Sequence, residues 1–295
     1  MTPPRRILVT GASSGIGRAC AHLLSTRGAA LALTARSAES LDEVRRECET
    51  RGATDVVVLP ADVADGPAVD AVVQQAVTRL SGLDGVIHAA GALAYGGFTD
   101  IPAEVFDRIV ATNVTGTANV ARSALRHFQQ QEAGSLVVVG SVLGKIAAPY
   151  MTPYCASKWA LQGLVRTLQI EARRSPGVEI GLVTPGGVNT PIYDLAGSYT
   201  GHPGHPPPPV YATERVAREV VAALDHPRRD TGVGFANPVM VLGFRLLPAA
   251  FDRMVGPLMR LLGQGRRHVD PHPGNVFVPR PELNGVRGRW PRVWG

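Results

Sequence analysis

Lysine is scarce in this sequence. Only two of its thirty basic residues are lysines, Lys145 and Lys158, and the other twenty-eight are arginines. A planar, strongly basic guanidinium does not replace a compact ammonium group where a neighbour's pKa must be lowered at close range. A lysine that is kept at one place in such a chain therefore calls for a specific chemical reason.

Cysteine is also rare, and Cys20, Cys48 and Cys155 show no CxxC spacing. An odd number of widely spaced cysteines in expected helices does not indicate a disulfide framework. Together with the expected lack of a signal peptide, this favours a reducing, cytoplasmic environment. The eight histidines include two close pairs in proline-rich loops, but neither pair has Cys or Glu at ligand spacing. We therefore expect no metal site.

The chain has no uninterrupted apolar run long enough to cross a bilayer. Hydrophobic residues make up 45% and charged residues 18% of the 295 residues, as is typical of a globular protein with a substantial core. The net charge of +6 suits an anionic ligand. Nucleic-acid binding is not expected, because no reading module or stripe of basic and aromatic residues accompanies the charge.

A glycine-rich turn follows an apolar segment at the start of the chain, within residues 6–17. The spacing is Gly-x-x-x-Gly-x-Gly, from Gly11 through Gly15 to Gly17, and a helical pattern follows. Such a strand, turn and helix can hold a pyrophosphate on the free N–H groups of the helix start. The alternative is a structural turn without a ligand.

The next expected strand, residues 29–34, ends in Ala35 and Arg36. A carboxylate near this point commonly binds the ribose 2′-hydroxyl of NAD. Here Arg36 could instead pair with a 2′-phosphate, which favours NADP(H) over NAD(H). A solvent-facing arginine is the alternative, and Glu39 could reach back toward the ribose.

Expected strands alternate with expected helices along most of the chain. Further apolar strands are predicted at 55–59, 85–89, 137–139 and 178–183, with helices between them. This alternation predicts an α/β fold with a parallel sheet and helices on both faces. Ligands of such sheets gather at the carboxyl ends of the strands. Asn113 is unusual, because it stands inside a long helix expected over 102–130, where asparagine needs a specific hydrogen bond or is incidental.

Tyr154 and Lys158 are four residues apart on a helix that is expected to begin at Thr152, so they share one face. The preceding strand delivers Ser141 at its carboxyl end. Lys158 could stabilise the phenolate of Tyr154, which would then exchange a proton near neutral pH. Taken alone, however, a Tyr-x-x-x-Lys spacing is also found on ordinary helix surfaces.

The end of the chain is expected to differ from the rest. We predict a catalytic domain over 1–230, with 186–212 as a substrate loop, a hydrophobic helical extension over 231–263 and an Arg/Pro-rich, extended or partly ordered tail over 264–295. The amphipathic segment 239–262 could pack over the substrate pocket, form a subunit contact or lie on a membrane surface.

Together these motifs resemble the short-chain dehydrogenase/reductase family over residues 5–226. The resemblance is carried by Thr10-Gly-Ala-Ser-Ser-Gly-Ile-Gly17, Asp62-Val63, Asn113, Ser141, Tyr154-x-x-x-Lys158 and Pro185-Gly186, in the family's order and spacing. It implies a Rossmann-like, doubly wound parallel sheet of about seven strands. His88 departs from the family, which commonly has Asn there; it could alter contacts near the cofactor or simply fill the strand end.

The resemblance implies that Tyr154 is the acid–base, that Lys158 lowers its pKa and binds the nicotinamide ribose, that Ser141 orients the substrate oxygen and that Asn113 holds a water. Besides Arg36, the implied dinucleotide-binding residues are Gly11, Ser13, Ser14, Gly15, Ile16, Gly17, Asp62, Val63, Ala90, Gly91, Tyr154, Lys158, Pro185, Gly186, Val188 and Thr190.

The sequence thus predicts an NADP(H)-dependent oxidoreductase of a small-molecule carbonyl or secondary alcohol that is apolar in character. The alternatives are a non-catalytic dinucleotide-binding regulatory protein and a membrane-surface reductase of a lipid-like or acyl-thioester substrate, peripheral to the membrane through 239–262. By resemblance to the family, the helices over 102–130 and 152–174 are expected to form the contacts of a homodimer or homotetramer.

Overall fold

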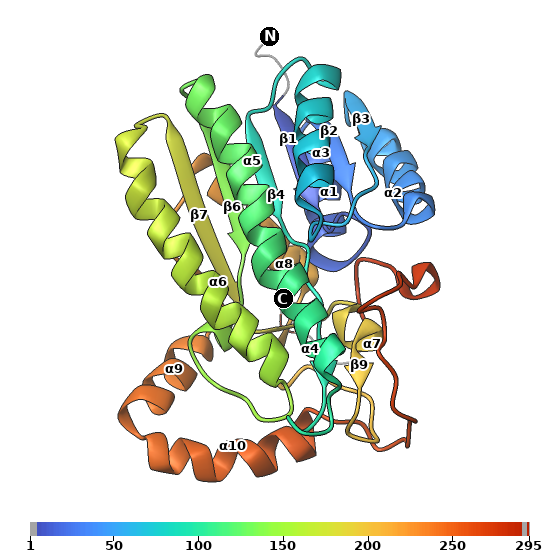
Figure 1. Ribbon diagram of the computed structural model, residues 1–295, viewed down its shortest axis with the longest axis vertical. Coiled ribbons are helices and arrows are strands. Elements are labelled where there is room, and N and C mark those ends of the chain that lie inside the picture. The colour runs from blue at the N-terminus through green and yellow to red at the C-terminus, as the bar shows by residue number, and fades with distance from the viewer. Residues whose placement is uncertain (1–4, 291–293, 295) are drawn as a thin grey trace.

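One sheet of seven parallel strands forms the centre of the molecule (Figure 1). The computed structural model describes residues 5–290 and 294. Across the sheet the strands lie in the order β11-β7-β6-β4-β1-β2-β3. Their bounds are β1 Arg6–Thr10, β2 Ala30–Thr34, β3 Asp55–Val58, β4 Gly85–His88, β6 Gly134–Val139, β7 Val178–Pro185 and β11 Thr231–Val233. The predicted fold class is therefore confirmed.

The strands are buried on both faces, which explains why they read as continuous apolar runs. Ile7 and Val9 of β1 point into one core and Leu8, between them, into the other. The same alternation separates Val137 from Val138 in β6. Each face needs a layer of helices because side chains alternate across a strand.

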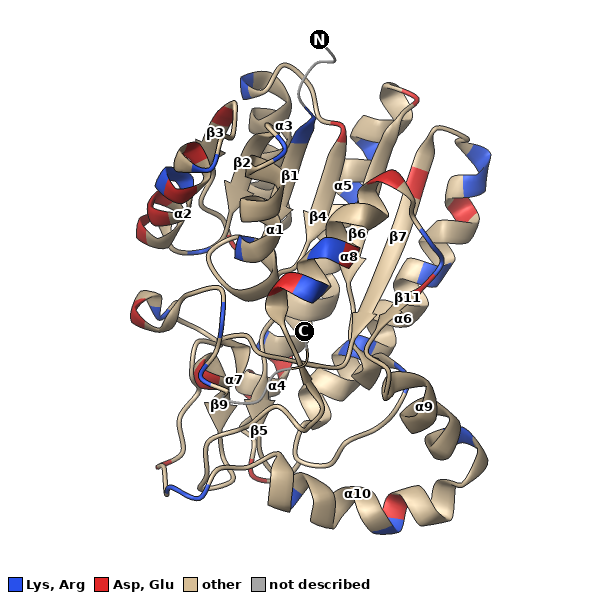
Figure 2. Cartoon of the chain, turned by 180° about the vertical axis from the view of Figure 1, so that it is seen from behind, with Lys and Arg blue, Asp and Glu red and all other residues tan. Residues whose placement is uncertain are grey.

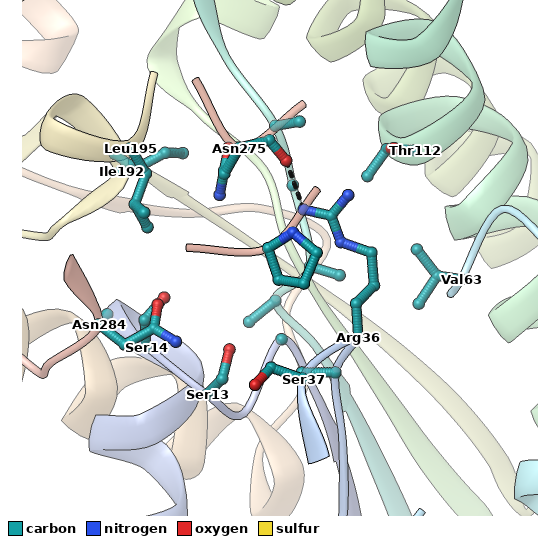
Figure 3. A pocket seen from close by; sticks show the side chains of 18 of the residues that line it. Ser13, Ser14, Arg36, Ser37, Val63, Thr112, Ile192, Leu195, Asn275 and Asn284 are labelled. Atoms are coloured by element: carbon teal, nitrogen blue, oxygen red, sulfur yellow. Dashed lines mark hydrogen bonds between the residues drawn. The ribbon is translucent and has the colours of Figure 1, made fainter. Parts of the chain in front are cut away.

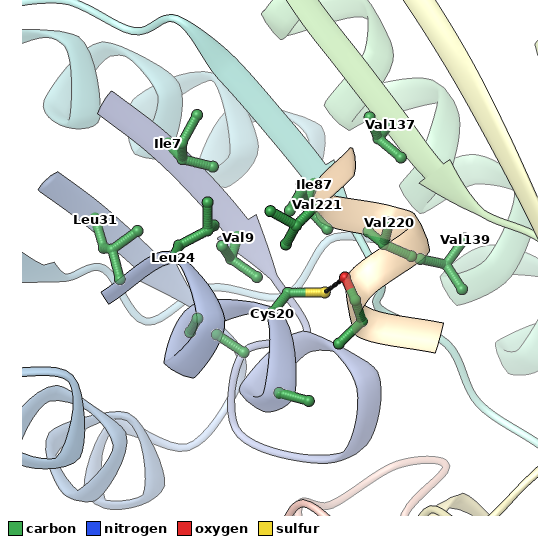
Figure 4. Packing of buried hydrophobic residues seen from close by; sticks show 14 of the residues in the cluster. Ile7, Val9, Cys20, Leu24, Leu31, Ile87, Val137, Val139, Val220 and Val221 are labelled. Atoms are coloured by element: carbon green, nitrogen blue, oxygen red, sulfur yellow. Dashed lines mark hydrogen bonds between the residues drawn. The ribbon is translucent and has the colours of Figure 1, made fainter. Parts of the chain in front are cut away.

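Three helices cover each face. The first core lies under α1 Gly15–Ser25, α2 Ala38–Thr50 and α8 Thr213–Asp225, and Figure 4 shows Cys20 and Leu24 of α1 packed there beside Val220 and Val221 of α8. The second core lies under three other helices: α3 Gly66–Arg79, α5 Gly116–Gln130 and α6 Thr152–Glu171. The three cysteines are buried and free.

The segment predicted as one helix over 102–130 contains a π-helical turn. The α-helix α4 Ala103–Val110 runs through Ala111–Thr115, which has π-helical geometry, into α5. Such turns widen a helix by one residue and are frequent at functional sites. The turn carries Asn113, and it explains how an asparagine is accommodated in the middle of this helix.

The seventh strand was not foreseen from the local pattern. Residues 231–233, which we assigned to the C-terminal extension, form β11 and pair with Val183–Pro185 of β7. The strand has three residues, one of which is glycine, so it lacks both the length and the β-branched run that identify the others.

Two helices follow β11: α9 Asn237–Leu246 and α10 Pro248–Leu262. Pro248 begins α10, whereas Pro257 lies inside it. In Figure 1 both helices lie beyond the carboxyl ends of the strands, away from the layers that cover the sheet. Figure 2 shows few charged positions along them.

Residues 263–290 then return along the carboxyl edge of the sheet with little regular structure. One 3-10 turn spans Pro281–Leu283, and isolated bridges join His272 to Ser198 and Gln264 to Gly204. The last part of the predicted tail, residues 291–293 and 295, lies outside the described residues.

The segment predicted as a substrate loop is also mostly irregular. Its short elements are β8 Gly187–Val188, α7 Ile192–Leu195, β9 Gly197–Ser198 and β10 Val210–Tyr211. β8 pairs with β10, and β9 pairs with β5 Ala94–Tyr95, which follows β4. These pairs hold the segment against the carboxyl edge.

Candidate active site

Two hollows adjoin at the carboxyl edge of the sheet. A groove of about 150 Å³ lies over the glycine-rich turn, and a cavity of about 410 Å³ lies over the ends of β6 and β7. Ile16, Gly91 and Thr190 line both, so the groove and the cavity are continuous. This is where ligands bind in doubly wound sheets.

The backbone of the glycine-rich turn is not covered by side chains, because two of its positions leave no room for a Cβ atom. A Cβ on Gly11, whose φ is +66°, would lie 2.7 Å from the backbone nitrogen of Ala90. A Cβ on Gly17 would lie 2.3 Å from the carbonyl oxygen of Gly11. Gly17 therefore packs α1 against the turn and does not itself line the groove.

Most of the predicted dinucleotide-binding residues do line the groove. Figure 3 shows Ser13, Ser14 and Arg36 around it. From the predicted set it is lined by Gly11, Ser13, Ser14, Gly15, Ile16, Arg36, Asp62, Val63, Ala90, Gly91 and Thr190. Four lining residues come from the C-terminal segment and had no signal in the sequence: Asn275, Pro279, Arg280 and Asn284.

Arg36 lies at the end of the groove expected for a 2′-phosphate, but its guanidinium has partners within the chain. It donates to the carbonyl oxygens of Asn275 at 2.5 Å, Val276 at 3.0 Å and Phe277 at 3.2 Å. Burial lowers the pKa of the guanidinium from its ordinary value. Glu39, which could have competed for the ribose, is exposed.

Tyr154 lies in the first turns of α6 and lines the cavity. Its side chain shares a hydrogen bond with that of Ser141, which also accepts from the backbone N–H of Leu143 at 3.1 Å. Burial raises the pKa of the Tyr154 phenol above its ordinary value, and the hydrogen bond with Ser141 opposes this rise only in part. The lowering of this pKa expected from Lys158 is therefore not found: the pKa is raised, and the phenol keeps its proton at neutral pH.

Lys158 is 5% exposed and has no carboxylate partner in the described part of the chain. Its Nζ lies 5.6 Å from the centre of the Tyr154 ring and donates to the carbonyl oxygen of Val139 at 3.1 Å. Burial lowers the pKa of this ammonium group to about 8. Its charge is thus held beside Tyr154 at neutral pH at the cost of desolvation.

Asn113 is fully buried and ties the loop after β4 to α6. Its Oδ1 accepts from the N–H of Ala92 at 2.8 Å, and its Nδ2 donates to the Ala92 carbonyl at 3.0 Å and to Ser157 Oγ at 2.9 Å. Ser157 in turn donates to the Tyr154 carbonyl at 2.8 Å. The specific hydrogen bonds that a mid-helix asparagine needs are therefore present, and they position the start of α6. We had not assigned Ser157, although it lies within the Tyr-x-x-x-Lys segment.

His88 fills the end of β4 and completes a buried chain of hydrogen bonds. Thr117 Oγ1 donates to the Asn113 carbonyl at 2.6 Å, so it must accept from His88 Nε2, 3.0 Å away. His88 Nδ1 is then the acceptor for the Thr10 hydroxyl at 2.8 Å. Burial, with a smaller contribution from the Lys158 charge, lowers the pKa of His88 to about 3, so the ring stays neutral.

The cavity is predominantly apolar. Strand ends and the substrate loop contribute one wall, and Pro185, Gly186 and Val188 from the predicted set lie there. The opposite wall comes from the extension, with Val239 and Met240 of α9 and these residues of α10: Phe251, Met254, Val255, Leu258 and Met259. Of the three arrangements expected for residues 239–262, packing over the pocket is the one that the side chains lining this cavity adopt.

Comparison with known proteins agrees with this geometry. The family model for short chain dehydrogenase matches residues 5–198. An uncharacterized oxidoreductase of Bacillus subtilis is 30% identical over 257 residues, which cover 86% of this chain and 72% of that protein. An NADPH-dependent pterin aldehyde reductase of Arabidopsis thaliana is 33% identical over 189 residues, 64% of this chain and 76% of that protein.

Among solved structures, an alcohol dehydrogenase from the archaeon Thermococcus sibiricus, complexed with 5-hydroxy-NADP, aligns with a TM-score of 0.68. The two are 28% identical, and the alignment covers 78% of this chain and 95% of the archaeal chain.

Proposed function

The chain belongs to the short-chain dehydrogenase family, and we propose that it is an NADP(H)-dependent oxidoreductase acting on a carbonyl or secondary alcohol. The observation that carries this proposal is the arrangement of Ser141, Tyr154 and Lys158 where an apolar cavity meets the groove over the glycine-rich turn. A binding protein without turnover has no need of these three groups together, which argues against the non-catalytic alternative.

The groove suits a dinucleotide. Its glycine-rich turn keeps the backbone bare at Gly11, and the start of α1 offers N–H groups and a positive dipole end to a pyrophosphate. Ser13, Ser14, Gly15 and Ile16 would hold the phosphates. When bound, the dinucleotide supplies the hydride that the protein's own side chains cannot provide.

The protein's part is to position the substrate oxygen and move one proton. Tyr154 would donate its phenolic proton to that oxygen during carbonyl reduction, and the raised pKa keeps the proton available at neutral pH. Ser141 would share the substrate oxygen with Tyr154. Lys158 would stabilise the negative charge that develops on Tyr154 as the proton leaves.

Replacing Tyr154 by Phe tests this assignment. We expect turnover to fall by about 10²–10⁴-fold, the usual contribution of general acid–base catalysis. NADPH affinity should be unchanged, because only the hydroxyl is removed. Tyr150→Phe is the matched control: Tyr150 accepts from Arg260 at 2.5 Å and does not line the cavity. Near-normal turnover in Y154F would contradict the acid–base role.

The preference for NADP(H) rests on Arg36 and is supported by two of the similar proteins, whose names or ligands contain NADP. Titration of cofactor-free protein with NADPH and NADH, side by side, needs no knowledge of the substrate. We expect NADPH to bind about tenfold more tightly, equivalent to about 1.4 kcal/mol, within reach of one charge-assisted contact. Equal affinities would remove Arg36 from the phosphate site. Binding of neither dinucleotide would contradict both the proposed function and the non-catalytic dinucleotide-binding alternative.

The substrate is proposed to be a fairly large apolar ketone or alcohol. The cavity of about 410 Å³ is in the range of pockets for small organic ligands, about 300–1,000 Å³. Leu143, Met151 and Met259 are among the side chains that would contact it. A series of ketones of increasing apolar size should show kcat/KM rising until the cavity is filled, whereas a preference for small polar ketones would contradict this assignment.

A second proposal is that α9 and α10 contact a membrane surface. No helix in the described residues is long and apolar enough to cross a bilayer. Nevertheless, these two helices expose apolar side chains, including Leu242 (59% exposed), Leu246 (67%) and Leu261 (74%). Arg245, Arg253 and Arg260 lie along the same segment, which suits anionic lipid headgroups.

Flotation of the full chain with phosphatidylserine-containing vesicles tests this second proposal. We expect the protein to float with the vesicles and the triple variant L242S/L246S/L261S to remain behind. Val278→Ser is the control, since Val278 is equally exposed (67%) but lies outside both helices. If the variant instead changes the sedimentation coefficient of a vesicle-free sample, the apolar face is a subunit contact.

The proposed oligomer formed by the outer faces of α4–α6 is tested by the same sedimentation experiment.

A further inference from the structure

The C-terminal segment crosses the groove over the glycine-rich turn. Residues 275–285, which we call the strap, contribute Asn275, Pro279, Arg280 and Asn284 to its lining. Figure 3 labels Asn275 and Asn284 among the side chains of this lining. The strap enters beside the end of α7, where the N–H of Asn275 donates to the Leu195 carbonyl at 2.9 Å. It is therefore seated on the edge of the catalytic domain.

Val276 anchors one end of the strap. Its side chain is fully buried in a small apolar cluster with Ala92, Ala94, Ile101, Val105 and Ile109, all from the chain that follows β4 and from α4. Val278, two residues along, is 67% exposed. Val276 is thus a specific apolar anchor of the strap, whereas Val278 is not.

The strap occupies two positions of the proposed dinucleotide site. At the position expected for the 2′-phosphate, the carbonyl oxygens of residues 275–277 accept from the guanidinium of Arg36. At the glycine-rich turn, the Gly285 carbonyl accepts from the N–H of Gly15 at 2.7 Å. That N–H is at the first residue of α1, where a phosphate oxygen would bind. Asn284 adds a hydrogen bond of 2.8 Å to Ser40 at the start of α2.

The strap also fills space. The groove retains about 150 Å³, below the roughly 300–1,000 Å³ of ordinary ligand pockets. The carbonyl oxygens of the strap imitate the phosphate oxygens of a dinucleotide at Arg36 and at Gly15. The two cannot make these contacts at once.

From these contacts we infer that the strap is an autoinhibitory segment, which competes with NADP(H) for Arg36 and the glycine-rich turn and must leave the groove for the cofactor to bind. This inference rests on the proposed dinucleotide-dependent function. The apparent affinity for NADPH is then the intrinsic affinity multiplied by the fraction of molecules whose strap is displaced. Any event that holds the strap elsewhere activates the enzyme.

The test compares Val276→Asp with Val278→Asp in the full chain. Both add one carboxylate to the strap, but only V276D places it in the apolar cluster, where an unpaired charge is strongly disfavoured. We expect V276D to bind NADPH at least about fivefold more tightly than wild type and V278D to bind like wild type. Equal NADPH affinity in all three proteins would overturn the inference. Weaker binding by V276D would also overturn it, and would show that the strap instead covers the bound cofactor and helps to hold it.

Hydrogen exchange of the wild-type protein gives a second measurement that does not depend on the folding of a variant. Amides of residues 275–285 should exchange faster when NADPH is bound, because the strap has been displaced. Slower exchange would mean that the strap closes over the cofactor and would overturn the inference. If neither wild type nor V276D binds NADPH or NADH, the proposed function itself fails, whereas binding without a difference between them removes only the strap's role.

Discussion

The surroundings of Lys145 and Lys158 differ sharply, although both lysines lie on the segment between β6 and the middle of α6. Lys145 donates to Asp230 at 2.5 Å and to Thr184 at 3.2 Å, and so ties this segment to the chain before β11. Within residues 5–290 and 294, Lys158 donates a hydrogen bond only to the Val139 carbonyl, and it lies beside the Tyr154 ring.

This difference shows what each charge does. The Lys145 charge is compensated by the carboxylate of Asp230. It therefore contributes to the fold and has little electrostatic effect on the proposed reaction. The Lys158 charge is buried without such compensation, which costs stability but leaves its field directed at Tyr154. A protein with only two lysines thus uses one for structure and, on the proposed function, one for chemistry.

The largest expected effect is on turnover. Replacing Lys158 by Met should lower kcat by about 10²-fold. Its ammonium lies 5.6 Å from the centre of the Tyr154 ring, and two unit charges at about this separation interact by about 3 kcal/mol at an effective dielectric of about 20. The same substitution at Lys145 should leave kcat within about threefold, since that side chain does not line either hollow. Single-turnover rates at saturating NADPH measure both. A comparable loss in K145M would mean that the two lysines do not differ in function.

The second effect is on stability, and here the two substitutions should have opposite signs. K145M should lower the free energy of unfolding by about 1–2 kcal/mol, because it removes an ion pair whose side chains are only 22% and 20% exposed. K158M should raise it by about 1–3 kcal/mol at pH 7, because it removes a buried charge whose pKa lies at about 8 instead of 10.5. Urea titrations of the three proteins decide the signs. Destabilisation by K158M would show that the Val139 hydrogen bond outweighs desolvation.

How far these roles could be predicted from the sequence depends on the range of the contacts. Tyr154 and Lys158 are one helical turn apart, so their spacing predicted that they share one face of a helix, and both lie on α6. The glycine-rich turn is likewise a local motif, and it lines the groove. The roles assigned to these residues rested on the family resemblance. The sequence could not predict that Asp230 pairs with Lys145, nor that Val276 sits among residues that follow β4. Those contacts join positions far apart in the chain, and no periodicity encodes them.

The same distinction applies to the pKa of Tyr154. Four-residue spacing correctly predicted that Lys158 would be near, but the burial of the phenol depends on α9, α10 and the substrate loop, which are remote in sequence. Desolvation by these elements reverses the direction expected from the lysine alone. Likewise, β11 is recognisable as a strand only because β7 lies next to it.

The smallest and most specific effect is the pH dependence of the Lys158 penalty. Because the pKa of Lys158 is lower in the native state than in the unfolded chain, the unfolded chain binds more protons between about pH 8 and 10.5. Wild-type stability should therefore rise relative to K158M across this interval. Below pH 8 both states carry the charge and the advantage of K158M is full; above pH 10.5 the advantage should be largely lost. Urea titrations at pH 7, 9 and 10.5, with K145M as the reference for general alkaline effects, measure the difference. An advantage of K158M that stays constant over this range would mean that it comes from packing and not from the buried charge.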